Sequence, residues 1–140
     1  MLKDSKKRGF TLVELMIVMA VIAVLAAILA PNFVRARAKS HLTACEQNLK
    51  TISTSIEMYL VKNEKLTLGS GDDWTFLTNG GKFLKVMPTC PAVGSMTYAI
   101  EVDETTLTEY TVYCKGANHE PCNIPPDYPC YVSSSGLHET

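Results

Sequence analysis

The sequence predicts an α+β protein in which one long N-terminal helix packs on a small antiparallel β-sheet head. Three stretches of the chain carry this prediction. An apolar run fills residues 10–30, a helical period follows over residues 32–62, and residues 96–115 are rich in Tyr, Thr, Val and Ile. At 140 residues, the chain suits one small domain plus a membrane-active segment rather than two domains.

The apolar run is long enough to cross a membrane. It contains 21 residues from Phe10 to Ala30, and Glu14 is the only charged residue among them. At 1.5 Å per helical residue, the run is about 30 Å long, which matches the hydrocarbon core of a bilayer. A carboxylate inside a membrane helix is costly and usually needs a partner, so Glu14 is a candidate functional residue.

Residues 31–62 continue the helix and give it one apolar face. Pro31 removes a backbone donor and clashes with the carbonyl of Ala27, so we expect a kink there, because the helical pattern resumes after it. Apolar residues then recur at alternating spacings of three and four, at Leu42, Cys45, Leu49, Ile52, Ile56 and Leu60. The opposite face carries Lys39, Gln47, Lys50, Ser53 and Glu57. One face should therefore pack on the head.

Residues 63–140 form the predicted head. Asp72 or Asp73 can cap a short helix that ends near Leu77. The cover over the long helix is expected from Trp74, Phe76, Leu77, Phe83 and Leu84. Residues 96–102 and 107–114 are expected to form a β-hairpin around a turn at 103–106. A symmetric turn places residue 98 opposite residue 111.

Charge and motif content exclude several classes of function. The net charge is −1, and from residue 96 onward there are seven acidic residues and one Lys, so nothing favours nucleic-acid binding. The chain contains neither a phosphate-binding loop nor a persuasive Ser/His/Asp or Cys/His arrangement. We therefore expect no enzyme and no cofactor.

The segment Lys6-Lys7-Arg8-Gly9-Phe10-Thr11-Leu12-Val13-Glu14-Leu15, with the apolar run behind it, resembles a known processing signal. It is similar to the N-terminus of type IV pilins and of the related type II secretion pseudopilins. The resemblance covers about residues 6–38, and Pro31 falls where many of these proteins carry a helix-bending proline.

The resemblance implies a processing route and a role for the helix. Residues 1–9 are then a leader that a prepilin peptidase cuts between Gly9 and Phe10, and the new amine of Phe10 is methylated. The chain would cross the inner membrane once, with its N-terminus inside, before its helix packs into an extracellular pilus or a periplasmic pseudopilus. Glu14 would pair with the Phe10 amine of a neighbouring subunit, and Thr11 could support that pair. Assembly machinery and identical subunits are the implied partners.

Five cysteines suggest disulfide bonds in an exported head, at positions Cys45, Cys90, Cys114, Cys122 and Cys130. An odd number leaves at least one thiol free or paired with another chain. Cys90–Cys114 and Cys45–Cys90 are both plausible bridges. Cys122–Cys130 is favoured, because it would close a small loop stiffened by three prolines, similar to the disulfide-bounded loop of many pilins.

A zinc site is the alternative to these disulfides. Cys114, His119, Cys122 and Cys130 could in principle supply ligands, but their spacing matches no familiar zinc pattern, so no metal is predicted.

The function that follows is that of a structural pilus subunit. It comprises a leader at residues 1–9, a transmembrane and filament-core helix half at 10–30, an amphipathic half at 31–62 and a head at 63–140. The alternatives are a pseudopilin of a type II secretion or competence apparatus, and a membrane-anchored adhesin or binding module that never polymerises.

Overall fold

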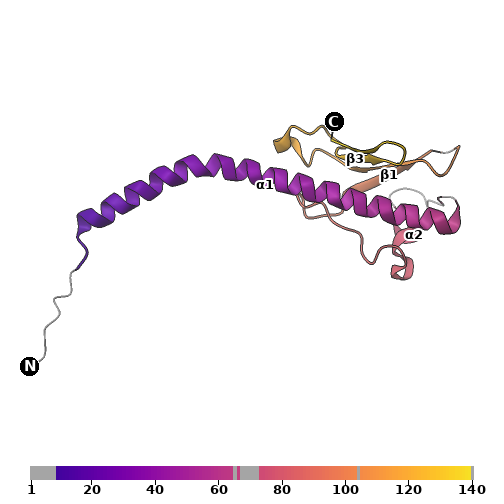
Figure 1. The fold of residues 1–140 in the computed structure, drawn as a ribbon, viewed down its shortest axis with the longest axis horizontal. Coiled ribbons are helices and arrows are strands. Elements are labelled where there is room, and N and C mark those ends of the chain that lie inside the picture. Colours follow the sequence, from indigo (N-terminus) through magenta and orange to yellow (C-terminus); the bar gives the residue numbers. More distant parts are fainter. Residues whose placement is uncertain (1–8, 65, 67–72, 104, 140) are drawn as a thin grey trace, which may run out of the picture. The chain divides into compact units, whose positions relative to one another are not determined.

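The computed structural model describes residues 9–64, 66, 73–103 and 105–139. Most of the predicted leader (residues 1–8), the candidate cap Asp72 and the turn residue Glu104 lie outside the described residues. The chain divides into two compact units between Val34 and Arg35. The helix α1 (Leu12–Asn63) contributes to both units (Figure 1).

The first unit consists of the N-terminal part of α1 and the residues just before it. Every side chain from residue 9 to residue 37 is exposed. The helix assignment is continuous through Pro31. The expected long helix is therefore confirmed, while the kink at Pro31 stays a prediction.

The second half of α1 forms the floor of the core in the second unit. Leu42, Cys45, Leu49, Ile52 and Ile56 are buried as the periodicity predicts, and Leu60 is half-buried. Ser53 was expected on the exposed face, and that expectation was wrong, because its side chain is 2% exposed. Its hydroxyl lies 2.8 Å from the Tyr110 hydroxyl, and this hydrogen bond allows a polar side chain to be buried there.

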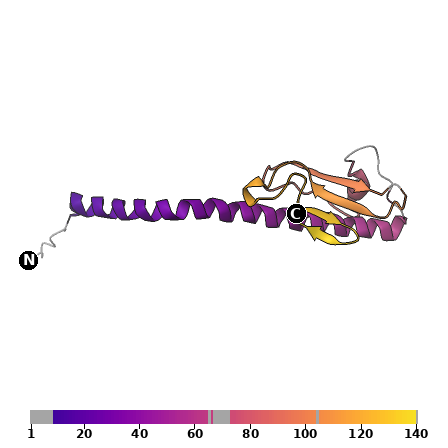
Figure 2. The same ribbon diagram turned by 90° about the horizontal axis from the view of Figure 1, so that it is seen from above.

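A four-stranded antiparallel sheet covers this half of α1. It contains β1 (Tyr98–Val102), β2 (Tyr110–Cys114), β3 (Cys130–Val132) and β4 (Gly136–His138), in that order across the sheet. Figure 2 shows the strands beside the C-terminal half of the helix. The α+β fold is thereby confirmed, and the two short C-terminal strands were not anticipated.

The hairpin register differs from the expected one. Tyr98 pairs with Cys114 rather than with Thr111, so the pairing is shifted by three residues. The cause is a longer loop. The carboxylate of Asp103 accepts hydrogen bonds from the Thr105 and Thr106 backbone amides, and the Asp103 amide donates to the Glu109 carbonyl at 2.9 Å. This local bonding holds most of the loop after Asp103 and delays the second strand until Tyr110.

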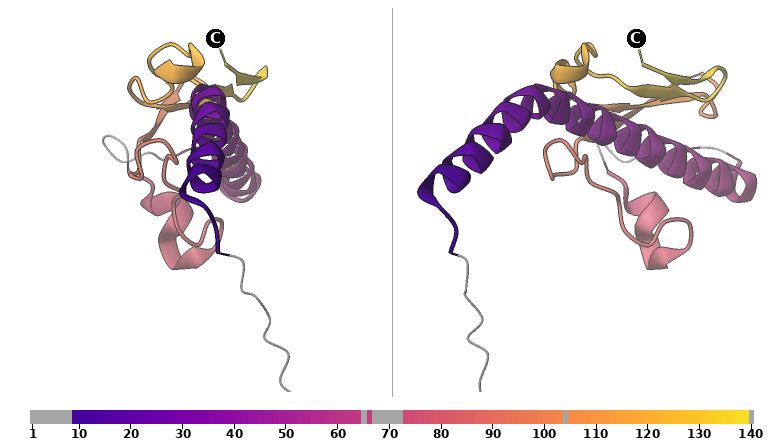
Figure 3. Two further views of the ribbon diagram at one scale, coloured as in Figure 1. Left: turned by 90° about the vertical axis from the view of Figure 1, so that its left-hand side faces the viewer. Right: turned by 60° about the vertical axis from the view of Figure 1, so that its left-hand side comes forward.

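Short helical turns complete the head. The helix α2 (Thr75–Thr78) leads directly into the turn η1 (Asn79–Gly81), and η2 (Glu120–Cys122) precedes β3. The N-cap position of α2 is Trp74, which makes no side-chain cap hydrogen bond, so Asp73 does not occupy the expected cap position. Asp73 lies one residue earlier and accepts a hydrogen bond from the Thr75 amide at 2.9 Å. Figure 3 shows α2 on the other side of α1 from the C-terminal strands. The aromatic and aliphatic side chains expected over α1 join this core, with Trp74 and Leu77 buried and Phe76, Phe83 and Leu84 partly buried against it.

Candidate functional site

The helix α1 begins with a reciprocal hydrogen-bonded cap. The Glu14 amide donates to the Thr11 hydroxyl oxygen at 3.2 Å. In return, Glu14 Oε2 accepts from the Thr11 amide at 2.9 Å and from the Thr11 hydroxyl at 2.7 Å. A Thr followed by a Glu three residues later forms a capping box, which satisfies amides that a helix start leaves without partners.

This cap leaves part of the Glu14 carboxylate available. Both bonds from Thr11 end on Oε2, so Oε1 can accept a bond from another group. Phe10 and Gly9 precede the helix, and the Phe10 side chain is 86% exposed. The predicted cleavage point and the acid therefore lie within four residues of each other, at the exposed start of α1.

Behind the cap, α1 presents apolar side chains on all sides. Large exposed residues continue from Leu12 through Val34. One helix is long and apolar enough to cross a membrane, and the qualifying stretch is wholly exposed within the described part of the chain. A segment that is apolar all round and unburied within its own chain requires lipid or other chains around it.

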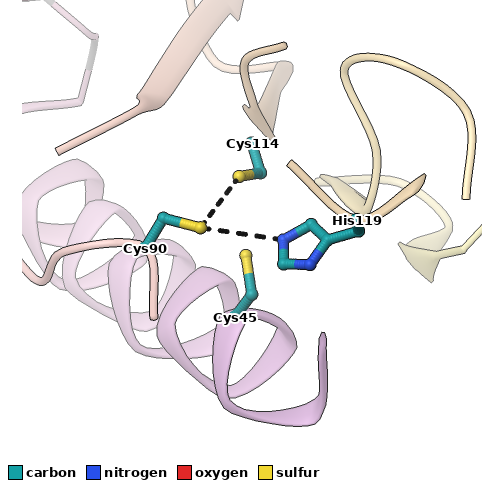
Figure 4. A group of neighbouring side chains, drawn as sticks. All are labelled: Cys45, Cys90, Cys114 and His119. Carbon is teal, nitrogen blue, oxygen red and sulfur yellow. Dashed lines mark hydrogen bonds between the residues drawn. The ribbon is translucent and has the colours of Figure 1, made fainter. Parts of the chain in front are cut away.

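A second group of candidate functional side chains lies in the head. Cys45 projects from α1, Cys90 from the loop before β1, Cys114 from the end of β2, and His119 from the residue before η2 (Figure 4). The three cysteines are 0% exposed and His119 is 2% exposed. One possible ligand atom from each residue lies within 4.8 Å of every other.

Hydrogen bonds surround the sulfur atoms of this cluster. The Tyr98 hydroxyl donates to Cys45 Sγ at 3.5 Å, and Asn118 Nδ2 donates to Cys114 Sγ at 3.5 Å. The Thr97 hydroxyl also lies 3.4 Å from Cys114 Sγ. The pKa of the Cys114 thiol is lowered, mainly by a hydrogen bond with Cys45 and less by those with Thr97 and Asn118. Burial acts in the opposite direction and raises this pKa. The same bond and burial raise the pKa of Cys45.

The structure brings together only some of the cysteines singled out from the sequence. Cys90 and Cys114 are neighbours as expected, with their sulfurs 3.7 Å apart, and all five cysteines are free thiols. The four residues considered as zinc ligands from the sequence do not form one group, because the cluster contains Cys45 and Cys90 in place of Cys122 and Cys130. The favoured Cys122–Cys130 disulfide stays a prediction.

The sequence pattern groups His119 with Cys122 and Cys130, whereas in the structure His119 lies beside Cys45 and Cys90. Its partners are 5, 29 and 74 residues away along the chain, at Cys114, Cys90 and Cys45. No local spacing signals such a set. One sequence feature did indicate part of the cluster. Cys45 lies on the apolar stripe of α1, so its thiol was expected to contact residues of the head.

Comparison with known proteins supports a specific family. The family described as the prokaryotic N-terminal methylation motif matches residues 4–30. The chain is 42% identical over 62 residues to the type IV major pilin protein PilA of Myxococcus xanthus, covering 44% of this chain and 28% of that protein. It is 36% identical over 78 residues to prepilin peptidase-dependent protein A of Clostridium perfringens, covering 50% and 56% of the two chains.

The secretion branch of the family is also represented. The type II secretion system core protein G of Escherichia coli is 32% identical over 59 residues, covering 42% of this chain and 41% of that protein. The alignments span between 28% and 56% of the length of these relatives. No solved structure matches this one. The chain thus carries the methylation motif at the start of its capped, exposed apolar helix, and part of it is similar to type IV pilins and to type II secretion core proteins.

Proposed function

We propose that this chain is a structural subunit of a type IV pilus, assembled through α1 into a surface filament and without catalytic activity. The observation that carries the proposal is the wholly exposed apolar half of α1 directly behind the capped Thr11–Glu14 turn. Lipid can surround this half before assembly, and the same half of neighbouring subunits can surround it in a filament. Relatives whose names include type IV major pilin support this function over the alternatives.

The proposed route begins in the inner membrane. The chain crosses it once, with its N-terminus on the cytoplasmic side and its head outside. A prepilin peptidase removes residues 1–9, and the amine of Phe10 is methylated. Pilus assembly machinery then extracts the subunit into a filament of identical chains, and a kink near Pro31 helps the helices pack. The head at residues 63–140 forms the outer surface.

Glu14 has a defined role in this route. The new amine of Phe10 is a cation. It can donate a hydrogen bond to Glu14 Oε1 of a neighbouring subunit, while Oε2 of that carboxylate keeps its bonds to Thr11. In an apolar filament core, an unpaired charge costs far more than a paired one, so the pair sets the axial register of the subunits. Thr11 positions the carboxylate.

A secretion or competence pseudopilin is the second candidate, and the resemblance to type II secretion core protein G favours it. A membrane-anchored adhesin or binding module that never polymerises is the third candidate. All three share the processed N-terminus and differ in where the processed chain accumulates.

The experiment is mass spectrometry of the N-terminal peptide, carried out on sheared surface material and on membranes of the producing cells. We expect a peptide that starts at methylated Phe10 in the sheared fraction. The same peptide confined to membranes would favour a pseudopilin or an anchored module. An intact leader in every fraction would overturn the proposed processing.

A further inference from the structure

The distances in the buried cluster are those of a metal-ligand shell. In a tetrahedral site with Zn–S near 2.3 Å and Zn–N near 2.0 Å, neighbouring ligand atoms lie about 3.5–3.8 Å apart. Cys90 Sγ lies 3.7 Å from Cys114 Sγ and 3.7 Å from His119 Nε2. The remaining separations stay within 4.8 Å. A small adjustment of side chains would close all four atoms around one ion.

The four possible ligand residues come from different parts of the head. Figure 4 shows Cys45 on the helix and Cys90, Cys114 and His119 facing it from the loop and sheet side. Cys90 begins a tight turn in which the Gly94 amide donates to the Cys90 carbonyl at 2.7 Å. The Val93 amide donates to the same carbonyl at 3.3 Å, so this turn fixes the backbone that carries the Cys90 thiol.

Hydrogen-bond donors contact two of the sulfur atoms in the cluster. Tyr98 bonds to Cys45, and Asn118 bonds to Cys114. Tyr98 is itself held by Asn48, whose Nδ2 donates to the Tyr98 hydroxyl at 2.9 Å. Such outer partners orient metal ligands and disperse the charge of bound thiolates, and a buried polar network of this kind is costly without a central partner.

We propose that Cys45, Cys90, Cys114 and His119 form a structural zinc site that joins α1 to the sheet of the head. Three thiolates and one neutral imidazole are a common zinc donor set, and four protein ligands leave no open position for catalysis. Binding displaces the thiol protons into solvent, so Zn²⁺ with three thiolates carries a net charge of −1. His119 binds through Nε2, which leaves the ring proton on Nδ1.

This site would stabilise the head where hydrophobic packing alone is limited. The second unit is a small domain, and small exported domains commonly rely on disulfides or metals. A zinc ion bound to these residues would crosslink α1, the loop before β1, β2 and the segment before η2. It would also protect Cys90 and Cys114 from oxidation to a disulfide. The inference is independent of whether the chain assembles into a pilus.

The test is zinc analysis of the full chain, purified from membranes in detergent without chelators. We expect one zinc ion per chain by elemental mass spectrometry, and a tetrahedral thiolate absorption spectrum after cobalt substitution. His119→Gln and Cys45→Ser should each lower zinc affinity by more than about tenfold in a competition titration, since even outer-partner changes cost 10–100-fold. Cys122→Ser is the matched control, because Cys122 lies outside the cluster, and it should keep full affinity.

Two further measurements keep the proposal falsifiable if a variant folds poorly. Removing zinc from the wild-type chain with a chelator should lower the melting temperature of the head by about 10 °C or more. Alkylation under denaturing conditions without reductant should label Cys45, Cys90 and Cys114 completely. A zinc-free chain in which Cys90 and Cys114 resist alkylation would overturn the proposal in favour of a disulfide. Zinc retained at full affinity in both ligand variants would also overturn it.

Discussion

Glu14 holds the first turn of α1 through Thr11 before any second chain is present. In the sequence, Glu14 stands out as a single charge in an apolar run. The structure adds a second role, because Glu14 also caps the helix through Thr11. A substitution that removes the side chain therefore disturbs two things at once, the helix cap and the proposed intersubunit pair. The charge and the cap can be separated, because Gln also serves in a capping box.

We expect Glu14→Gln to keep the first turn of α1 and to reduce filament assembly, because the amide cannot neutralise the Phe10 amine. Glu14→Ala should lose both the cap and the pair. The measurement is the yield of sheared filaments, compared with the amount of processed chain in membranes. Thr11→Ser, which keeps a capping hydroxyl, is the matched control. Wild-type assembly by Glu14→Gln together with failure of Glu14→Ala would show that Glu14 acts through the cap alone.

Tyr110 is the polar residue that ties the sheet to α1. Its hydroxyl lies 2.8 Å from the Ser53 hydroxyl and donates to Glu57 Oε1 at 2.7 Å. We expect Tyr110→Phe to lower the free energy of unfolding by about 1–2 kcal/mol, because it leaves the buried Ser53 hydroxyl without this partner. Denaturation followed by the fluorescence of Trp74, the single tryptophan and a buried one, measures the change. Tyr128→Phe is the control and should change little.

Burial, followed by the hydrogen bond to Glu57, raises the pKa of Tyr110 above its ordinary value. The unfolded chain then loses the Tyr110 proton first, at about pH 10, so the unfolded state binds fewer protons than the folded one. The stability of the head should be fully present below about pH 10 and should fall as pH rises further. Urea midpoints on either side of this pH test the effect. The fall should be shallower in Tyr110→Phe, and an unchanged slope would contradict this role of Tyr110.

At the scale of elements, α1 has two halves with opposite surroundings. The periodic stripe of the second half packs in the head, whereas the first half is exposed on every side. The stripe could be predicted because a period of 3.6 residues places its members on one face. The burial of Ser53 could not, because it depends on Tyr110, which lies 57 residues away along the chain.

Equivalent truncations in the two halves of α1 should therefore behave differently. Ile52 is 0% exposed, and Ile52→Ala should lower the free energy of unfolding of the head by about 2–5 kcal/mol through lost burial and a cavity. Ile22 is 55% exposed, so Ile22→Ala should leave head stability unchanged. Urea denaturation monitored by Trp74 compares the two. Similar losses in both variants would mean that the N-terminal half also packs on the head.

At the scale of the whole molecule, the buried core residues among those described lie in the second unit, from Leu42 to Cys130. The described residues of the first unit, from residue 9 onward, add apolar surface and no core. This division allows one chain to carry a folded head and an exposed apolar helix end, as a pilin-like subunit requires.

A chain that begins at Arg35 should consequently fold and stay monomeric in water. Its core is complete, and it lacks the exposed apolar stretch that drives association. Circular dichroism should show α and β structure with cooperative melting, and light scattering should give the mass of one chain. The full chain without detergent should form large particles instead. An unfolded or aggregated shorter chain would show that the first unit contributes to the head.

The sequence by itself determined the long helix, its apolar and amphipathic halves, the motif at Gly9–Glu14 and the presence of a β-hairpin. These are local patterns, and their physical basis is contained in a few helical turns or one strand. Only the structure revealed the hairpin register, in which Tyr98 pairs with Cys114, and the two short strands that extend the sheet beyond β2. It also decided which thiols meet. Cys45, Cys90, Cys114 and His119 come from segments far apart in the sequence, and only packing of the sheet on α1 brings them within reach of one another.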